Sequence, residues 1–382
     1  MAQRLKTDWL LFVTVLAMVS FGLLILYSAS SIMAKMDSRY NSSWYFVIHQ
    51  AGWAILSIGV MMAIKRTSYR KLNDSAIAFG AIGSALLLLL AAYIFDSGAH
   101  RWLRFGPVGL QPSELAKPAL VVFLAFFVSW KRSAINSGRY TLFPAALAVG
   151  LLIFGVVVAD LGTAVVLGAA ASVVFFVAGL ERRYCAIVGM VAALGLVIFI
   201  ALSPYRLARV VRFFDPNFTL IEKFDRNGTI KQQMEKSLAT RDTNYQSQQA
   251  KIAVGAGGPL GLGLMNGKQK LLYLPEAHTD FIYAVVGEEL GTFGAGGLLI
   301  AFIVILWRGL RTAWLVEDNF GRYLALGVTV VVVVQGMMNM SVVLGMMPTK
   351  GIPLPMISYG GSSLLSTLLL LGMLMNVSEH AG

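Results

Sequence analysis

Ten long apolar runs constrain this chain more than any other feature of its sequence. An α-helix needs about 20 consecutive apolar residues to cross the hydrocarbon core of a bilayer. The composition agrees with repeated crossing, because 57% of the residues are hydrophobic and 13% are charged, whereas about 25% are charged in soluble domains. We therefore expect an all-α integral membrane protein with about ten transmembrane helices, near residues 9–34, 45–64, 76–95, 114–130, 143–159, 161–179, 185–203, 281–307, 322–345 and 357–377.

Lysine and arginine are unevenly divided between the two alternating sets of short connections. One set carries most of them, in Arg4, Lys6, 65–71, 131–139, 181–183, Arg308, Arg311 and Arg322. The other set holds Lys35, Arg39, Arg101, Arg104 and Lys350. Because short loops rich in Lys and Arg remain in the cytoplasm, we expect both termini to be cytoplasmic. Residues 204–279 then form a large extracytoplasmic loop between the seventh and eighth helices.

We expect residues 1–382 to form a single domain, since neither an internal repeat nor a separate soluble domain is visible. The net charge of +12 is divided between the orientation signal and a basic outer loop. Nucleic acid does not suit a loop on the outer face, whereas an anionic lipid head group or a pyrophosphate does.

The large loop contains two segments that suit such an anion. "SPYRLARVVRFFDP" is typical of an interfacial amphipathic helix that ends at Asp215-Pro216, with Arg206, Arg209 and Arg212 at helical spacing. A snorkelling surface helix and a phosphate clamp both remain open for it. The glycine-rich segment "GAGGPLGLGLMNG" matches neither the G-x-G-x-x-G pattern nor the P-loop. We expect it to be a flexible loop whose backbone can approach a ligand.

Four polar features lie at the outer ends of the apolar runs. In "HRWLRFGPVGLQPSELAKP", Pro112 suits the first position of a helix and Glu114 its first turn. Glu114 and Lys117 are either a simple intrahelical ion pair or a functional pair within the membrane. Trp102 fits an interface anchor as well as a site. The second feature, "ADLGTA", places Asp160 where it can cap a helix.

The third feature, "YLPEAHTDFIYAVVGEELG", gathers several titratable side chains at the start of an apolar run. Pro275 can begin a helix that Thr279 or Asp280 caps. Glu288 lies about two turns deeper than Asp280, so its carboxylate needs a partner or a proton. His278 has no other histidine at a ligand spacing, so we expect no histidine-based metal site.

The fourth feature, "MPTKGIPLPMISYGGSS", contains prolines and glycines that interrupt a helix at membrane depth. Such backbone is tolerated only when it is buried in protein or lines a cavity, and Lys350 would face that cavity. A transporter usually has repeated halves and broken helices near the midplane. An enzyme acting on a lipid-linked anion would instead keep its polar groups at one surface, as this chain does, so we favour the enzyme.

Four motifs taken together, "QPSELAKPALVVFLA", "ADLGTA", "LPEAHTDFIYAVVGEELG" and "PTKGIPLPMISYGGSS", resemble those of the SEDS family (shape, elongation, division and sporulation). The resemblance implies a ten-helix peptidoglycan glycosyltransferase in the bacterial cytoplasmic (inner) membrane. Its substrate would be lipid II. Its partners would be a class B penicillin-binding protein, other membrane proteins of the division machinery and membrane lipids. The chain is more similar to the division branch, FtsW, than to the elongation branch, RodA.

The resemblance also implies roles for individual residues. Asp280 matches the family's essential extracytoplasmic aspartate, which would be the general base for the C4 hydroxyl of a lipid II sugar. The candidates to stabilise the departing undecaprenyl pyrophosphate are Lys350 first, then Lys117, Arg206, Arg209 and Arg212. The candidate substrate-binding set is completed by Trp102, Ser358, Glu114 and Glu288, the last two as groups that position cations or helices. No cofactor is assigned, and a bridging divalent cation, Mg²⁺ or Mn²⁺, is left open.

Two other functions remain open. A lipid II flippase would need a continuous polar path to the inner face, and the spans contain few charged residues beyond Lys117, Glu288 and Glu289. A non-catalytic scaffold for the division machinery would use Asp280 merely to cap a helix.

Overall fold

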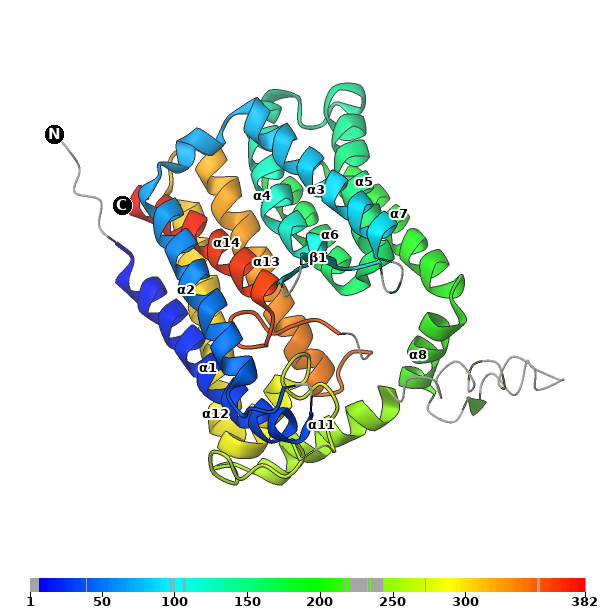
Figure 1. The fold of residues 1–382 in the computed structure, drawn as a ribbon. Helices are drawn as coiled ribbons and strands as arrows, with labels where there is room; N and C mark the ends of the chain where they lie inside the picture. The colour runs from blue at the N-terminus through cyan, green and yellow to red at the C-terminus, as the bar shows by residue number, and fades with distance from the viewer. Residues whose placement is uncertain are drawn as a thin grey trace.

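Ten long helices account for the ten apolar runs in the computed structural model (Figure 1). The structure describes residues 7–38, 40–96, 98, 100–105, 108–215, 218–219, 232, 234, 243–271, 273–348 and 351–381. The helices are α1 (Trp9–Met36), α2 (Tyr45–Arg66), α3 (Ser75–Phe95), α4 (Pro112–Trp130), α5 (Phe143–Ala159), α6 (Leu161–Val177), α7 (Arg182–Ala201), α12 (Ile282–Leu315), α13 (Asn319–Val343) and α14 (Gly361–Glu379). Within these described residues, nine are long and apolar enough to cross a membrane, and α6 is a shorter apolar helix of 17 residues. The prediction of an all-α membrane protein is confirmed.

Shorter elements connect the spans. They are the 3₁₀-helices η1 (Tyr69–Leu72) and η2 (Arg132–Ala134), the π-helical turn η3 (Gly138–Leu142), the helices α8 (Pro204–Phe214) and α11 (Thr243–Gly257), and the strands β1 (Leu103–Phe105) and β2 (Val108–Leu110). The antiparallel hairpin β1–β2, which pairs Leu103 with Leu110, was not predicted. It lies between α3 and α4, next to Trp102 and Gln111, which line the cavity described below.

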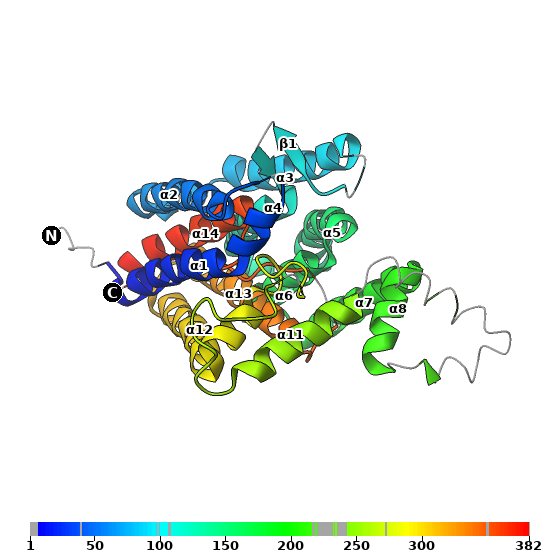
Figure 2. The same ribbon diagram turned by 60° about the horizontal axis from the view of Figure 1, so that its bottom comes forward.

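The core of the bundle is formed by α4, α13 and α14, most of whose residues are buried. α14 packs against α2, and α13 packs against α12 and α4. By contrast, none of the residues of α7 is buried, and its neighbours are α6 and α8. α7 and α8 accordingly lie at the edge of the molecule in both views (Figures 1 and 2).

The connections rich in Lys and Arg meet at one end of the bundle. Three side-chain contacts join them there: Asp8 with Arg308 (2.6 Å), Lys65 with Glu379 (2.8 Å) and Arg132 with Asn319 (2.8 Å). The start of α1 and the end of α14 therefore lie at the same end, as the charge pattern predicts. That this end faces the cytoplasm stays a prediction.

The long connection between α7 and α12 contains α8 and α11. The predicted amphipathic helix is confirmed as α8, which begins at Pro204 and ends at Phe214. Asp215 follows as the C-cap, as its sequence position indicates. Of residues 216–242, only 218, 219, 232 and 234 belong to the described residues.

α12 is interrupted at Gly291, where φ is 64° and ψ is −162°. The glycine-rich loop after α11 fills the interruption, because Leu262 N donates to Glu288 O (3.0 Å) and Gly263 N donates to Glu289 O (2.9 Å). A Cβ at Gly261 would stand 2.2 Å from Glu289 O. The loop's backbone thus approaches α12 and supplies the hydrogen bonds that the broken helix lacks. That it also approaches a ligand stays a prediction.

The start of α12 also differs from the prediction. Pro275 begins no helix, because residues 273–281 form turns and α12 begins at Ile282. Phe281 is the N-cap, and no side chain of the described chain caps the helix. The physical reason is tertiary: Tyr359 N donates to His278 O (3.0 Å), and Ser358 Oγ donates to Thr279 O (2.6 Å). These contacts hold the segment in a non-helical conformation and leave Asp280 out of a capping role.

Candidate active site

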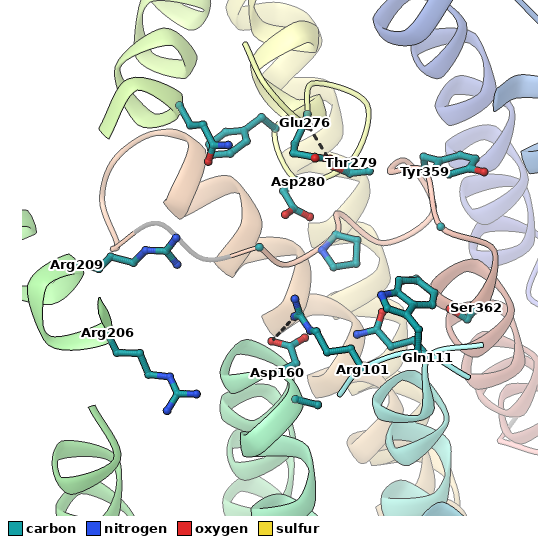
Figure 3. A pocket seen from close by; sticks show the side chains of 18 of the residues that line it. Arg101, Gln111, Asp160, Arg206, Arg209, Glu276, Thr279, Asp280, Tyr359 and Ser362 are labelled. Carbon is teal, nitrogen blue, oxygen red and sulfur yellow. Dashed lines mark hydrogen bonds and ion pairs between the residues drawn. The ribbon is translucent and has the colours of Figure 1, made fainter. Parts of the chain in front are cut away.

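A polar cavity of about 760 Å³ lies at the ends of α12 and α14 opposite Arg308 and Glu379 (Figure 3). Its lining comes from segments far apart in the sequence: the residues before β1, the junction of α5 and α6, α8, the turns before α12, and the segment from Gly351 into α14. The volume falls in the range of about 300–1,000 Å³ that is typical of small-ligand sites. The broken backbone between α13 and α14 lines a cavity, as the sequence predicts.

The acidic wall of the cavity carries Asp280 and Glu276 on the turns before α12. Thr279 Oγ1 donates to Glu276 Oε2 (2.8 Å), and the side chain of Asp280 is half-buried. Gly351 faces Asp280 so closely that an added Cβ would stand 2.5 Å from Asp280 Oδ2. The glycine therefore leaves room for the carboxylate between two irregular segments.

Three arginines form the basic side of the same cavity: Arg101, Arg206 and Arg209. Figure 3 shows Arg206 and Arg209 projecting from α8, while Arg101 lies below Asp280 beside Asp160. Arg101 Nη2 is 3.8 Å from Asp160 Oδ1, too long for a hydrogen bond, and its buried Nε has no hydrogen-bond partner among the described residues. An anion in this cavity would meet a guanidinium with unused donors.

The side chain of Asp96 and the hairpin β1–β2 hold Arg101 and Trp102 at the cavity. Asp96 Oδ2 accepts hydrogen bonds from Arg101 N (2.8 Å) and Trp102 N (3.2 Å), and these bonds hold the pKa of Asp96 below its usual range. Gly109 on β2 leaves space for the Trp102 ring, whose nearest atom would lie 3.2 Å from an added Cβ. A short strand pair thus positions an aromatic ring that the sequence could equally assign to an interface anchor.

The predicted cap of α6 is confirmed. Asp160 Oδ1 accepts from Gly162 N (2.9 Å) and Oδ2 accepts from Thr163 Oγ1 (2.7 Å). Asp160 also lines the cavity and faces Arg101, a second contact that the sequence did not indicate.

Glu114 and Lys117 form a buried ion pair inside the bundle. The predicted position of Pro112 as the first residue of α4 is confirmed, with Glu114 in the first turn. Lys117 Nζ donates to Glu114 Oε2 (2.7 Å) and to Gln335 Oε1 (2.6 Å), and both charged side chains are only 1% exposed. Among the described residues, the lining of the cavity includes neither of them. Lys117 is connected to the cavity wall through Gln335, which donates to Pro353 O.

Glu288 is likewise 1% exposed and lies outside the described lining of the cavity. Its Oε1 accepts from Lys268 N (2.7 Å) and Gln269 N (3.1 Å), so the residues directly after the glycine-rich segment provide the partner that a buried carboxylate requires. The neighbouring Glu289 accepts from Lys270 Nζ (2.5 Å) and Ser28 Oγ. The carboxylates of Glu288 and Glu289 therefore hold residues 265–270 against α12.

The remaining predicted residues, Ser358, Arg212 and Lys350, differ in their positions relative to the cavity. Ser358 is buried beside the site, where its Oγ accepts from Leu354 N (2.8 Å) and donates to Thr279 O. Arg212 lies on α8 outside the described lining of the cavity. Lys350 lies outside the described residues.

Sequence reasoning missed Arg101, Gln335 and Asn339. Arg101 counted only as a charge in a loop, although its place beside Trp102 at the outer end of a span was a usable signal. Gln335 and Asn339 lie in a strongly apolar run, where two amides one turn apart were the available signal. Within the described part of the chain, no group of three or more His, Cys, Asp or Glu side chains is arranged to hold a metal ion.

Fold and site together define a polytopic α-helical membrane protein with a cavity at one end that sets carboxylates against arginines. Residues 8–382 match the model of the FtsW/RodA/SpoVE family, described as cell cycle protein, and the chain belongs to this family. The resemblance drawn from the four motifs is confirmed.

Named relatives and solved structures cover nearly the whole chain. It is 37% identical to a probable peptidoglycan glycosyltransferase FtsW of Geobacter sulfurreducens, over 98% of this chain and 96% of that one. It is 33% identical to stage V sporulation protein E of Bacillus subtilis, over 99% of each chain. A chain in a structure titled "Structural coordination of polymerization and crosslinking by a peptidoglycan synthase complex" superposes with a TM-score of 0.74 at 28% identity, over 98% of each chain. The rod shape determining protein RodA of Thermus thermophilus gives 0.67 at 26% identity, also over 98% of each chain.

Proposed function

We propose that this protein is a peptidoglycan glycosyltransferase of the FtsW type, which polymerises lipid II into β-1,4 glycan strands during cell division. The observation that carries the proposal is the cavity, in which Asp280 lies opposite the guanidinium groups of Arg101, Arg206 and Arg209. Glycosyl transfer from a lipid diphosphate needs a base on one side of the reacting carbon and cations on the other. The FtsW relatives and the family membership support the same reaction.

In the proposed step, Asp280 accepts the proton of the C4 hydroxyl on the acceptor sugar. The hydroxyl oxygen forms a bond to the anomeric carbon of the donor as the bond from that carbon to the diphosphate oxygen breaks. The electron pair leaves on undecaprenyl pyrophosphate, and attack from the opposite face converts an α-linked donor into a β-1,4 product. A general base placed within hydrogen-bond reach typically contributes about 10²–10⁴-fold.

The leaving diphosphate is assigned to the arginine side of the cavity. Charge-assisted hydrogen bonds from guanidinium groups suit phosphate oxygens, and Arg101 and the α8 arginines supply them. Lys350 remains proposed as a further cation. For Lys117, Glu114, Glu288 and Ser358 we propose a supporting role, since their bonds hold the segments that carry the lining.

The proposed setting is the bacterial cytoplasmic membrane, with both termini in the cytoplasm and the cavity on the outer side. The gathering of basic connections at the opposite end supports this orientation. The proposed partners are lipid II, a class B penicillin-binding protein, other membrane proteins of the division machinery and membrane lipids. The structural similarity to a peptidoglycan synthase complex that couples polymerization and crosslinking supports the penicillin-binding partner.

Buried charges favour polymerisation over lipid II transport. A flippase needs a polar path that opens along the spans, whereas Lys117 is bonded to Glu114 and Gln335, and Lys270 to Glu289. Both pairs are closed and buried within the described bundle, which favours a bracing role for these charges.

The test is polymerisation of lipid II by the purified protein with its cognate penicillin-binding partner. Asp280→Ala and Asp280→Asn should abolish glycan strands while the complex still assembles. Asp74→Asn is the matched control, since this exposed carboxylate caps α3 at the basic end (Ala76 N to Oδ1, 2.6 Å). Normal strand formation by both Asp280 variants would rule out Asp280 as the general base. If the wild-type complex makes no strands but translocates lipid II in liposomes, the protein is a transporter and the proposed enzymatic function is wrong.

A further inference from the structure

Two amide side chains one turn apart on α13, Gln335 and Asn339, lie directly behind the cavity wall. Both are only 2% exposed. Asn339 Nδ2 donates to Asp280 O (2.8 Å) and to Ile352 O (2.7 Å). One amide group therefore joins the segment that carries Asp280 to the segment that carries Gly351.

Gln335 makes a similar connection one turn earlier in α13. Its Nε2 donates to Pro353 O (2.9 Å), and its Oε1 accepts from Lys117 Nζ (2.6 Å). Lys117 is in turn paired with Glu114 (2.7 Å). A continuous chain of hydrogen bonds thus runs from the buried ion pair on α4 to a residue that lines the cavity.

These bonds matter because neither segment belongs to a helix or sheet that would fix its position. Residues 273–281 are turns, and residues 351–360 have no regular structure. A ladder of backbone hydrogen bonds normally places a catalytic group, whereas here isolated contacts do so: Tyr359 N and Ser358 Oγ bind the carbonyls of residues 278 and 279, and Asn339 on α13 binds that of Asp280 itself. The contact between Gly351 and the Asp280 carboxylate has little tolerance, since a Cβ would stand 2.5 Å from Oδ2.

The arrangement of Asn339 is not the one that stability alone would favour. Its Oδ1 is buried without a hydrogen-bond partner among the described residues, and an unsatisfied buried acceptor costs free energy. The amide is oriented so that both hydrogens serve the two segments of the site. This orientation indicates that the role of Asn339 is to donate hydrogen bonds to these two segments.

We propose that Asn339 and Gln335 are positioning residues that hold the Asp280 carboxylate in register with the 351–353 wall. The proposal rests on the proposed function, in which Asp280 is the base. Neither amide lines the cavity within the described residues, so neither contacts the substrate. Their loss should lower the rate of the chemical step and leave the affinity for lipid II largely unchanged.

The experiment measures kcat and KM for lipid II, assembly with the partner and thermal unfolding of each variant. Asn339→Leu removes both donations at similar volume, and Asn339→Ala is the second variant should the leucine prevent assembly. Gln335→Glu keeps an acceptor for Lys117 but removes the donation to Pro353. The matched control is Asn376→Leu, because this amide is also 2% exposed and donates to the carbonyls of Ile64, Lys65 and Thr67 at the opposite end of the bundle.

A misplacement of about 1 Å can cost roughly 10²-fold in rate. We therefore expect Asn339→Leu to lower kcat by about 10²-fold with KM within about threefold, and Gln335→Glu by about tenfold. Asn376→Leu should lower the unfolding temperature by about as much as Asn339→Leu does, because both remove a buried amide. Its kcat per folded molecule should equal that of wild type.

Three results would overturn the proposal. The first is a kcat within about threefold of wild type for both Asn339 variants, and the second is an effect on KM alone. The third is an equal loss of activity in the Asn339 and Asn376 variants that follows the fraction of folded protein. A fully active Asp280→Asn protein would instead show that Asp280 is not the general base. The two failures are therefore distinguishable.

Discussion

Asp280 and Gly351 are in direct contact across the cavity wall, although 71 positions separate them in the sequence. The carboxylate of Asp280 occupies the space that any side chain at position 351 would take. The motif "PTKGIPLP" therefore contributes to the cavity wall through the absence of a Cβ at Gly351.

Gly351→Ala should lower polymerisation by about 10²-fold with little loss of stability. The added methyl group meets the end of a side chain, so the chain can adjust by moving the Asp280 carboxylate, and that movement displaces the proposed base. The measurement is the initial rate of strand formation alongside thermal unfolding. Gly168→Ala, on α6 with nothing within 4 Å of the added Cβ, is the control. Equal rates for both variants would show that the contact is not needed.

Lys270→Met should destabilise the protein by about 3–5 kcal/mol. Lys270 and Glu289 are 1% and 0% exposed and 2.5 Å apart, so removing the lysine leaves a buried carboxylate without its counter-charge. Unfolding in detergent measures the change. The double variant Lys270→Met with Glu289→Gln removes both charges and should recover most of the lost stability. A double variant as unstable as the single one would show that burial of the charge is not the cause.

Arg101→Ala should raise KM for lipid II by about tenfold or more, because each charge-assisted hydrogen bond contributes about 1.5–3 kcal/mol. Arg101 lines the cavity with a buried Nε that lacks a partner among the described residues. Arg183→Ala removes an exposed arginine that pairs with Glu181 before α7, and it controls for net charge. Steady-state kinetics over a range of lipid II concentrations measures the effect. The assignment fails if the two variants have the same KM.

The stability of the protein should fall as the pH decreases below about 6.5, the ordinary pKa of histidine. Burial lowers the pKa of His278 below that value, an effect that Glu276 partly opposes. The unfolded chain then binds more protons than the folded protein in this range, so the stabilisation is complete above pH 6.5 and is lost as the pH falls through the lowered pKa.

Unfolding temperatures at pH 7.5 and 5.5 test this expectation. His278→Gln should show a smaller difference between the two conditions than wild type. His49→Gln, which removes an exposed ring, is the control. An unchanged pH dependence in His278→Gln would assign the acid sensitivity to other groups.

Local features of the sequence were sufficient for the spans and for two helix starts. The ten runs became ten helices because a bilayer-length apolar segment must satisfy its backbone internally. Pro112 begins α4 and Asp160 caps α6 as predicted, since the requirements of a helix N-terminus are set by the few residues around it.

The relative positions of the polar motifs could not be predicted in this way. Pro275 had a valid local signal for a helix start, but hydrogen bonds from Tyr359, Ser358 and Asn339 take the carbonyls of residues 278–280. Tertiary contacts outweighed the local preference. Similarly, Gly261 met the backbone of α12 because Gly291 breaks that helix, a contact between positions that no local pattern relates.

The sequence by itself therefore determined a helical membrane protein with ten apolar helices, the basic and polar ends of its bundle, its family and Asp280 as the candidate base. Only the tertiary structure decided which charges share the cavity with Asp280. Arg101 lies there, whereas Lys117 and Glu288 are bonded elsewhere. The physical reason is that a buried charge must find a partner wherever the packing places one, and residues distant in the chain supply it.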